Sequence, residues 1–580
     1  MDANALEEEQ LAGTQRIFAR VEGVDQTSTL FSEHVTLIPQ PTQSPNDPLN
    51  WSPWRKYWHA TLVLFMTALT AAISNDAGAA SDPMLDTLGI DYAVQNTAAG
   101  VLFIGIGYWT LLASPMPYLY GRKIMYLICL VFAIGGSIWF ARTEYVEDAI
   151  WNQLFVGASE SCAEALVQLS LSDLFFQHQR GMVLGIYILA TSIGTFLGPL
   201  IAGYISADIG WRWVGWTTVT IAGVTLLVFI FGLQETSFDR DTLSGGRLVN
   251  PANPNLDVAG EKAAAEASQM APSGSTESLG GAHDHQKSYW QSIAIITPAR
   301  NLIGTGFKQY FRRLYNSLRV FYFPAVIYAG LQWGAQDAWL SFYLTIEEDN
   351  YYDAPWYYGD TAVAIMNVPT LIGAIIGCFY GGWFSDYFVQ WMAKRRGGIS
   401  EAEDRLWLML PSGIINPAGL MLFGICSGKG MSWPAPYVGL GMIGFGWGCA
   451  GDLSMAYLMD AYPDMVLEGM VGVAVINNTL ACIFTFVCSY WINASGLANT
   501  FIAIGVLSLF FHLLTVPMMY WDQRPAGACN CSRSSEENSK PAGSTCACGK
   551  RSSDSCTCGG TEVGKGSELE TDFTTKASGA

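Results

Sequence analysis

The sequence predicts an all-α integral membrane protein with twelve transmembrane helices in two six-helix bundles. Of its 580 residues, 51% are hydrophobic and only 14% are charged, and the charges gather at both ends and in the middle of the chain. Between them recur apolar runs of about 20 residues, the length at which a helix spans a bilayer. We count twelve runs, at residues 57–79, 94–117, 123–141, 151–175, 182–206, 212–233, 320–344, 358–384, 406–424, 435–460, 468–491 and 497–520.

The longest interruption, residues 234–318, divides these runs six and six. Its segment Gly260–Lys287 is rich in Ala, Ser and Gly and is expected to be disordered. The predicted parts are a disordered cytosolic arm (1–56), a first bundle (57–233), a partly disordered cytosolic loop (234–318), a second bundle (319–521) and a disordered, Cys-rich cytosolic tail (522–580).

Basic residues mark one side of the predicted bilayer. The acidic N-terminal arm lacks the pattern of a cleaved signal peptide, so the first span is expected to start insertion. Lys and Arg favour cytosolic loops, which places both termini in the cytosol, and we expect a multi-pass protein of the cell membrane. The basic residues lie at Arg122, Lys123, Arg180, Lys308, Arg312, Arg313, Arg319, Lys394, Arg395, Arg396 and Arg405, and the opposite loops carry Glu144, Glu147, Asp148, Glu347, Glu348, Asp349 and Asp353.

A glycine-rich stretch stands out in the fifth span. Gly194, Gly198 and Gly203 lie roughly along one side of the predicted helix, where another helix backbone can approach closely. Pro199 removes one backbone hydrogen bond and bends the helix. A packing seam and a functional motif both fit this pattern.

Carboxylates inside predicted spans are costly and usually functional. Glu160 and Glu164 are four residues apart in the fourth span and so share a helix face. One of two such neighbours can bind and release a proton, and the pair can also attract an ammonium group. Hydrogen bonds to a neighbouring helix are the structural alternative.

Three further in-span acids complete the predicted substrate and proton site. Asp337 lies among Trp and Gln residues, which suits a cation held by charge and by ring faces. Asp452 follows a glycine-broken stretch near the middle of the tenth span. Asp76 lies near the outer end of the first span, where a loop role and a binding role are both open.

Several function classes are disfavoured. The spans that should form a cavity have acids but no well-placed Lys or Arg, which disfavours an anionic substrate. There is no phosphate-binding GK[ST] loop, no G-x-S-x-G elbow and no His/Cys ligand set in the spans, so we expect no enzyme, no cofactor and no metal site. The net charge of −19, without a basic patch, argues against nucleic acid as a partner.

Two features lie outside the spans. Three C-x-C pairs in the tail suit a soft metal or palmitoylation, although a reduced, flexible tail is the interpretation we favour. Asn493 begins the sequon Asn493-Ala-Ser495 in the last outer loop and is a candidate glycosylation site.

Four stretches together resemble the major facilitator superfamily over about residues 45–523. More narrowly they resemble the fungal 12-spanner drug:proton antiporter branch, and Ser172–Gly181 with Glu401–Trp407 is similar to a polyamine and organic-cation subgroup. The four stretches are Asn46–Lys56, Gly198-Pro199 with Gly203, Gly210-Trp-Arg-Trp213 and Glu235-Thr236.

The resemblance implies proton-driven export for the Gly194–Gly203 stretch and a conformational role for the loop residues Arg122 and Asp386. Two positions depart from the family pattern. Tyr118 stands where the first-half loop usually has Asp, although Asp386 keeps that Asp in the second half. Gln153 stands where antiporters usually have a buried Arg that is associated with proton coupling.

We therefore expect a proton-coupled transporter, working as a monomer by alternating access. Its substrate is expected to be a small organic, cationic or amphiphilic compound, exported as a drug, toxin or secondary metabolite. The alternative is proton-coupled uptake of a polyamine or similar cation. A non-transporting sensor is a third class, disfavoured because the soluble parts have a disordered composition.

Overall fold

A computed structural model describes most of the span-forming part of the chain. The C-x-C tail, most of the N-terminal arm and part of the central loop lie outside the described residues. These are 14–16, 18–20, 31–35, 39, 41–42, 44–238, 287–299, 302–349, 351, 354–396, 399–431 and 433–520.

The first half consists of helices that cover the first six predicted spans. The fourth span is helical throughout but contains a π-helical segment, η3, between α6 and α7. The elements are η1 (Pro48–Asn50), α1 (Pro53–Asn75), η2 (Gly78–Ala80), α2 (Ser81–Leu88), α3 (Tyr92–Ala113), α4 (Met116–Leu119), α5 (Lys123–Ala141), α6 (Val146–Ser161), η3 (Cys162–Leu166), α7 (Val167–Leu174), η4 (Gln177–Gln179), α8 (Arg180–Asp208) and α9 (Arg212–Gly232).

The second half follows α12 and α13 and covers the other six predicted spans. A second π-helical segment, η6, lies between α16 and α17. The elements are α12 (Tyr289–Ser292), α13 (Phe307–Ser317), η5 (Leu318–Tyr322), α14 (Pro324–Asp349), α15 (Asp360–Ile365), α16 (Asn367–Phe379), η6 (Tyr380–Phe384), α17 (Ser385–Arg395), η7 (Ala402–Leu408), α18 (Met409–Gly428), α19 (Ala435–Ala461), η8 (Pro463–Met465), α20 (Val466–Ser495), α21 (Leu497–Leu513) and α22 (Thr515–Met519).

Short strands add two small pairings. β1 (Thr14–Arg16) pairs antiparallel with β4 (Ile399–Glu401), and β2 (Phe18–Arg20) pairs antiparallel with β3 (Phe31–Val35). Three of the four strands fall in the arm for which the sequence predicts disorder. The β1–β4 pairing brings this part of the arm beside the segment between α17 and α18.

Nine helical segments among the described residues are long and apolar enough to cross a membrane. The other three predicted spans are also helical, namely α6–η3–α7, α14 and α19. These three carry Glu160 with Glu164, Asp337 and Asp452, respectively. The three predicted spans outside this group of nine thus carry most of the predicted site.

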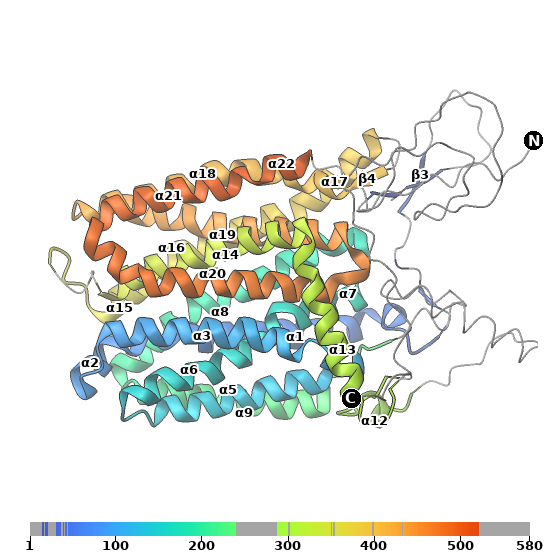
Figure 1. Ribbon diagram of the computed structural model, residues 1–580, viewed down its shortest axis with the longest axis horizontal. Helices are drawn as coiled ribbons and strands as arrows, with labels where there is room; N and C mark the ends of the chain where they lie inside the picture. The colour runs from blue at the N-terminus through green and yellow to red at the C-terminus, as the bar shows by residue number, and fades with distance from the viewer. Residues whose placement is uncertain are drawn as a thin grey trace, which may run out of the picture. The chain divides into compact units, whose positions relative to one another are not determined.

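The two halves lie against each other along their long helices (Figure 1). Within the first half, α3 packs on α6, and α5 packs on α6 and α9; within the second, α19 packs on α16 and α18. Between the halves, α3 packs on α20 and α8 packs on α16. The pairs α3–α20 and α8–α16 therefore form the boundary where a site shared by both halves can lie.

The glycines of α8 serve two different contacts. A Cβ at Gly194 would overlap the carbonyl oxygen of Ala68, and one at Gly198 would lie 2.8 Å from Ala72 Cα, so both glycines admit the α1 backbone. Gly203 instead faces Ala364 of α15 in the second half, at 3.2 Å. The prediction that the three glycines share one side is therefore wrong for Gly203, because five residues turn a helix by about 500° rather than 400°.

Gly194→Ala is expected to destabilise the protein by about 1–3 kcal/mol, because the added methyl group overpacks the α1–α8 contact. The matched control is Gly223→Ala on α9, where a Cβ would meet nothing within 4 Å. Thermal unfolding in detergent, followed by size-exclusion chromatography, measures both variants. Equal melting temperatures for the two would contradict a close α1–α8 contact at Gly194.

Candidate substrate site and gate

Three carboxylates from the two halves come together in the interior. Glu160 at the end of α6 and Glu164 in η3 interact electrostatically with Asp337 of α14. Asp337 is 9% exposed, and both glutamates are partly buried. The interactions described for these three carboxylates involve no Lys or Arg. The cluster is therefore a concentration of acidic groups without a basic counter-ion among the described residues.

The local backbone at the glutamates departs from a regular α-helix. Glu160 lies in the last turn of α6, and Glu164 lies in the π-helical segment η3, which widens the helix by about one residue per turn. The two glutamates remain close enough to interact. Segments of this kind occur frequently at functional sites. The sequence predicted that the glutamates share a face but contained no signal for the π-helical segment.

Aromatic rings enclose Asp337. The indole Nε1 of Trp447 donates a hydrogen bond to Asp337 Oδ1 at 3.1 Å. The Trp447 ring lies 4.8 Å from Trp333 and 5.8 Å, edge-on, from Phe196 of the first half. A Cβ at Gly451 would overlap the Trp333 ring, so this glycine makes room for the indole. The aromatic wall beside Asp337 is thus built by both halves.

Asn477 of α20 lies between two of the carboxylates. Its side chain is close to both Glu164 and Asp337. It is fully buried, and neither of its amide atoms has a hydrogen-bond partner within 3.5 Å among the described residues. The amide therefore faces Glu164 and Asp337, and the three side chains together offer acceptors and a donor to a polar ligand.

Asp452 does not join this cluster. It is fully buried against the backbone of Gly185, Gly381 and Gly382, at the contact between α19, α8 and η6. Its electrostatic neighbours are Arg405 and Asp386, and neither of its carboxylate oxygens has a hydrogen-bond partner among the described residues. The expectation that Asp452 shares a site with the glutamates is therefore corrected, since α19 turns this side chain toward the gate described below.

Asp76 also points away from the cluster. It follows α1 as its C-cap, and its Oδ1 would lie 3.0 Å from a Cβ at Gly198. It lines a small cavity inside the first bundle together with Gln153 and Gly215. Asp76 thus lies in the turn that follows α1, as the loop alternative expects, and its side chain does not join the carboxylate cluster. Gln153, which stands where antiporters usually have an Arg, lines the same cavity as Asp76.

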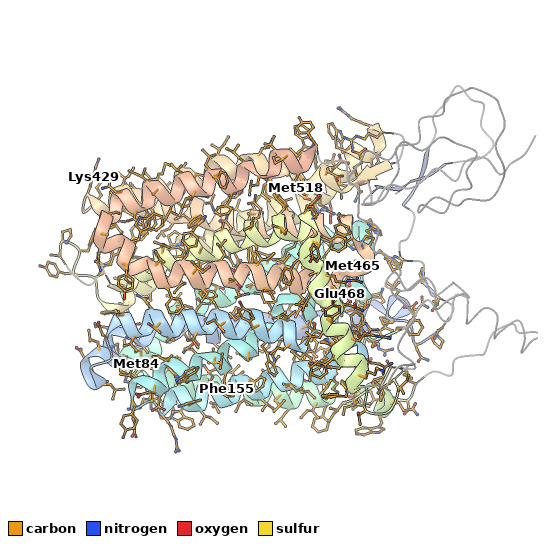
Figure 2. All side chains as sticks on the ribbon, viewed as in Figure 1. Met84, Phe155, Lys429, Met465, Glu468 and Met518 are labelled. Carbon is orange, nitrogen blue, oxygen red and sulfur yellow. The ribbon has the colours of Figure 1, made fainter. Side chains whose placement is uncertain are left out.

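A larger cavity leads toward the cluster from one end of the helices. It occupies about 870 Å³, including the solvent space at its mouth, and both halves line it through Ser74, Gln153, Phe103, Ser341 and Thr485. Ser74 lies next to the Glu160 carboxylate. Met84, which also lines the cavity, lies at the end of the molecule opposite Glu468 (Figure 2). The cavity therefore opens away from the end that carries Glu468.

Contacts between the halves close that other end. We call it the basic end because it carries Arg122, Arg180, Arg313 and Arg405. Asp386 of α17 accepts hydrogen bonds from the backbone N–H groups of Gly181 at 3.1 Å and Met182 at 2.7 Å, in the first turn of α8. Arg180 donates to the carbonyl of Met459 at 2.8 Å and lies 3.5 Å from Asp460. These contacts join α8 to the second half.

Arg405 forms ion pairs with Asp386 and Asp460, the two carboxylates that contact the first half. It lies 2.8 Å from Asp386, 2.7 Å from Asp460 and 2.7 Å from Ser385 Oγ, and is 3% exposed. The sequence singled out Asp386 but treated Arg405 only as a marker of sidedness. A buried guanidinium between two carboxylates could not be inferred without knowing that α17, η7 and α19 converge.

The first half has a different arrangement at the same end. Arg122 pairs with Asp173 at 2.8 Å, and Glu235 accepts from the backbone N–H groups of Arg122 at 3.0 Å and Lys123 at 3.1 Å. Tyr118, which replaces the family Asp, donates to Glu468 in the first turn of α20 at 3.3 Å. Tyr118 thus joins the first half to α20 through a donor, whereas Asp386 joins the second half to α8 as an acceptor.

Asn493 is exposed in the last turn of α20, close to the bend at Gly496. Asn493 and Glu468 therefore lie at opposite ends of α20. The glycosylation of Asn493 stays a prediction.

A sequence model of the Major Facilitator Superfamily matches residues 60–486. A second, described only as a domain of unknown function, DUF7871, matches residues 517–576, which include the C-x-C tail. The solved structure of the proton:xylose symporter XylE has a TM-score of 0.54 at 11% identity and covers 81% of this chain and 97% of its own.

Full-length relatives are similar over most of their sequences. An uncharacterized MFS-type transporter of Schizosaccharomyces pombe is 52% identical over 84% of this chain and 88% of its own. Protein HOL1 of Saccharomyces cerevisiae is 52% identical over 85% of this chain and 90% of its own. The MFS antiporter QDR3 of Candida albicans is 20% identical over 77% of this chain and 74% of its own.

Proposed function

The chain belongs to the Major Facilitator Superfamily and is a multi-pass membrane transporter of small solutes rather than an enzyme, and on that premise we propose that it couples the movement of protons to the transport of an organic cation. The superfamily predicted from the sequence is confirmed. The drug:proton antiporter branch and the organic-cation subgroup stay predictions.

The observation that carries the proposal is the Glu160–Glu164–Asp337 cluster. It combines three acidic groups, no basic counter-ion among the described residues and the indole rings of Trp333 and Trp447. A cationic ligand gains both Coulomb attraction and ring-face contacts in such a site, whereas an anion would be repelled. The cluster is formed by α6–η3 of the first half and α14 of the second, so relative motion of the halves would change it.

Proton coupling follows from the same groups. A carboxylate that holds a proton in one step and a cation in the next exchanges one for the other, and this competition links the two gradients. Glu164 is our candidate for this exchange, because it interacts with both other carboxylates and with Asn477. Asp76, beside Gln153 in its separate cavity, is a second candidate for holding the proton.

The two ends of the transporter have complementary roles in this proposal. The inter-half contacts of Asp386 and Arg180 close the basic end, and the cavity lined by Ser74 and Thr485 opens at the other. Following the positive-inside tendency, we assign the basic end to the cytosol, with both termini there and the cavity facing outward. Alternating access then requires the Asp386 contacts to break.

Export is the direction that we propose first. The Gly194–Gly203 stretch resembles the antiporter motif, and QDR3, which aligns with this chain at 20% identity, is named an antiporter. Uptake of a polyamine or similar cation is the second candidate. It is favoured by Gln153, which stands where the antiporter pattern has an Arg.

Reconstituted full-length protein tests the function and its direction together. Proteoliposomes with an imposed pH gradient are assayed with labelled spermidine, tetraphenylphosphonium and an organic anion of similar size. We expect at least one cation to move in response to the gradient and the response to stop when a protonophore is added. Movement against the proton flow supports export, and movement with it supports uptake. Transport of the anion alone, or transport that does not respond to pH, would overturn the proposal.

A further inference from the structure

Helix α13 (Phe307–Ser317), which precedes the first span of the second half, has a surface that the transport cycle does not explain. Figure 1 shows it steeply inclined to the long helices and crossing them at one end. It contacts α3 of the first half and α20 of the second. A helix in this position runs along the plane of the bilayer surface rather than through the bilayer. The sequence predicted a loop, not a helix, in this part of the chain.

One face of α13 is fixed to the transporter. The Tyr310 hydroxyl donates to the carbonyl of Leu112 at the end of α3. The Arg313 guanidinium lies over the Tyr118 ring at 4.7 Å. Just before the helix, the Tyr120 hydroxyl donates to the carbonyl of Thr305 at 2.6 Å. These contacts determine which face of α13 is turned outward.

The outward face is aromatic. Phe307 is 71%, Phe311 52% and Tyr315 67% exposed, and at four-residue spacing they form one stripe along the helix. Tyr322, beyond the end of α13, is 86% exposed. Rings exposed to this extent at regular spacing would be unfavourable in water, so the stripe indicates an apolar or interfacial environment.

The stripe is bordered by positive charge. Lys308 and Arg312 lie beside it at about 100° and 140° from Phe307, and Arg319 follows the helix; all three are exposed. None of them forms an ion pair among the described residues. The sequence from His285 to Gln336 contains no Asp or Glu. The whole segment is therefore cationic.

We propose that α13 binds the anionic phospholipid headgroups of the leaflet at the basic end. The Phe307–Phe311–Tyr315 stripe lies at the boundary between headgroups and acyl chains, and Lys308, Arg312 and Arg319 bind the phosphates and carboxylates of the headgroups. An amphipathic helix with rings on one face and basic residues beside them has the composition of an interfacial helix. Each basic residue near an anionic surface strengthens binding by about fivefold.

Hydrogen–deuterium exchange of the full-length protein in nanodiscs tests the proposal without a transport substrate. Nanodiscs of phosphatidylcholine alone are compared with nanodiscs that contain about 30 mol% phosphatidylserine. For peptides within residues 302–323, we expect exchange to slow by about 5- to 25-fold in the anionic nanodiscs, as one or two basic contacts would give. Because both leaflets carry the anionic lipid, the result does not depend on the orientation of the chain.

Paired variants locate the effect. Lys308→Gln/Arg312→Gln should remove the dependence on phosphatidylserine, whereas Lys394→Gln/Arg395→Gln, an equal loss of charge on exposed residues of α17, should retain it. Phe307→Ser/Phe311→Ser should speed exchange in both lipid mixtures. Gel filtration checks that each variant is folded.

Three results would overturn the proposal. The first is exchange at α13 that is the same in both lipid mixtures. The second is an equal loss of the lipid effect in the α17 control. The third is protection of α13 by an acidic polypeptide such as polyglutamate but not by phosphatidylserine, which would indicate a protein partner instead.

Discussion

Glu164→Gln is expected to abolish proton-driven accumulation of substrate while leaving the protein folded and in the membrane. Glutamine keeps the size and one acceptor of the side chain but can neither ionise nor exchange a proton. Hydrogen bonds to a charged group contribute about 1.5–3 kcal/mol, so cation affinity should fall by about 10- to 100-fold. Accumulation against a gradient should disappear altogether, because coupling requires the proton to leave and return.

The measurement separates a proton role from a substrate role. Proteoliposomes are assayed for accumulation driven by a pH gradient and for exchange of labelled against unlabelled substrate at equal pH. If Glu164 only carries the proton, the variant should still exchange substrate at high substrate concentration. If Glu164 contacts the substrate, both accumulation and exchange should fall. The matched control is Glu147→Gln, an exposed glutamate in the first turn of α6, which should transport normally. Full accumulation by the Glu164 variant would remove this residue from the mechanism.

Asp386→Asn is expected to open the basic end. The carboxylate accepts from two backbone N–H groups at the start of α8 and pairs with buried Arg405, so its neutralisation weakens both a helix-terminus contact and a charge network. Only the two hydrogen bonds to α8 join the halves, since Asp386 and Arg405 both belong to the second half, and a hydrogen bond to a charged group contributes about 1.5–3 kcal/mol. Losing about 3 kcal/mol from these two inter-half hydrogen bonds would shift the equilibrium between closed and open states by about 100-fold.

Distances between spin labels on the two halves measure this opening. Labels at Trp54→Cys and Lys394→Cys, both exposed positions near the basic end, should move apart in the Asp386 variant in a background without other cysteines. Asp404→Asn is the matched control. Asp404 is also buried and pairs with an arginine, Arg396 at 2.7 Å, but both residues belong to the second half. An unchanged distance distribution in the Asp386 variant, or the same shift in the Asp404 control, would show that Asp386 does not hold the halves together.

Much of the architecture was predictable because hydropathy is a local property. A run of about 20 apolar residues becomes a membrane helix wherever it lies in the chain, so the twelve helical segments and their division at 234–318 could be derived from composition alone. The same reasoning identified Glu160, Glu164 and Asp337, since a carboxylate in a span is conspicuous without a structure.

Helices outside the spans were harder to predict. Helix α13 has only 11 residues and is too polar for a membrane span, although the four-residue spacing of Phe307, Phe311 and Tyr315 is an amphipathic helix pattern that could have identified it. The π-helical segments η3 and η6 were also unpredicted, because no residue type specifies a one-residue widening of a helix. Both depend on what the neighbouring helices allow.

By itself, the sequence determined that this protein has acidic groups within membrane helices, glycines on its fifth span and Asp386 at a loop. Only the tertiary structure decided which of them meet. It joined Asp337 to the two glutamates, turned Asp452 toward Arg405 and Asp76 into the first bundle, and placed Gly203 against the second half. The physical reason is that a side chain's partners depend on the rotation and packing of whole helices, which long-range contacts set and local sequence does not.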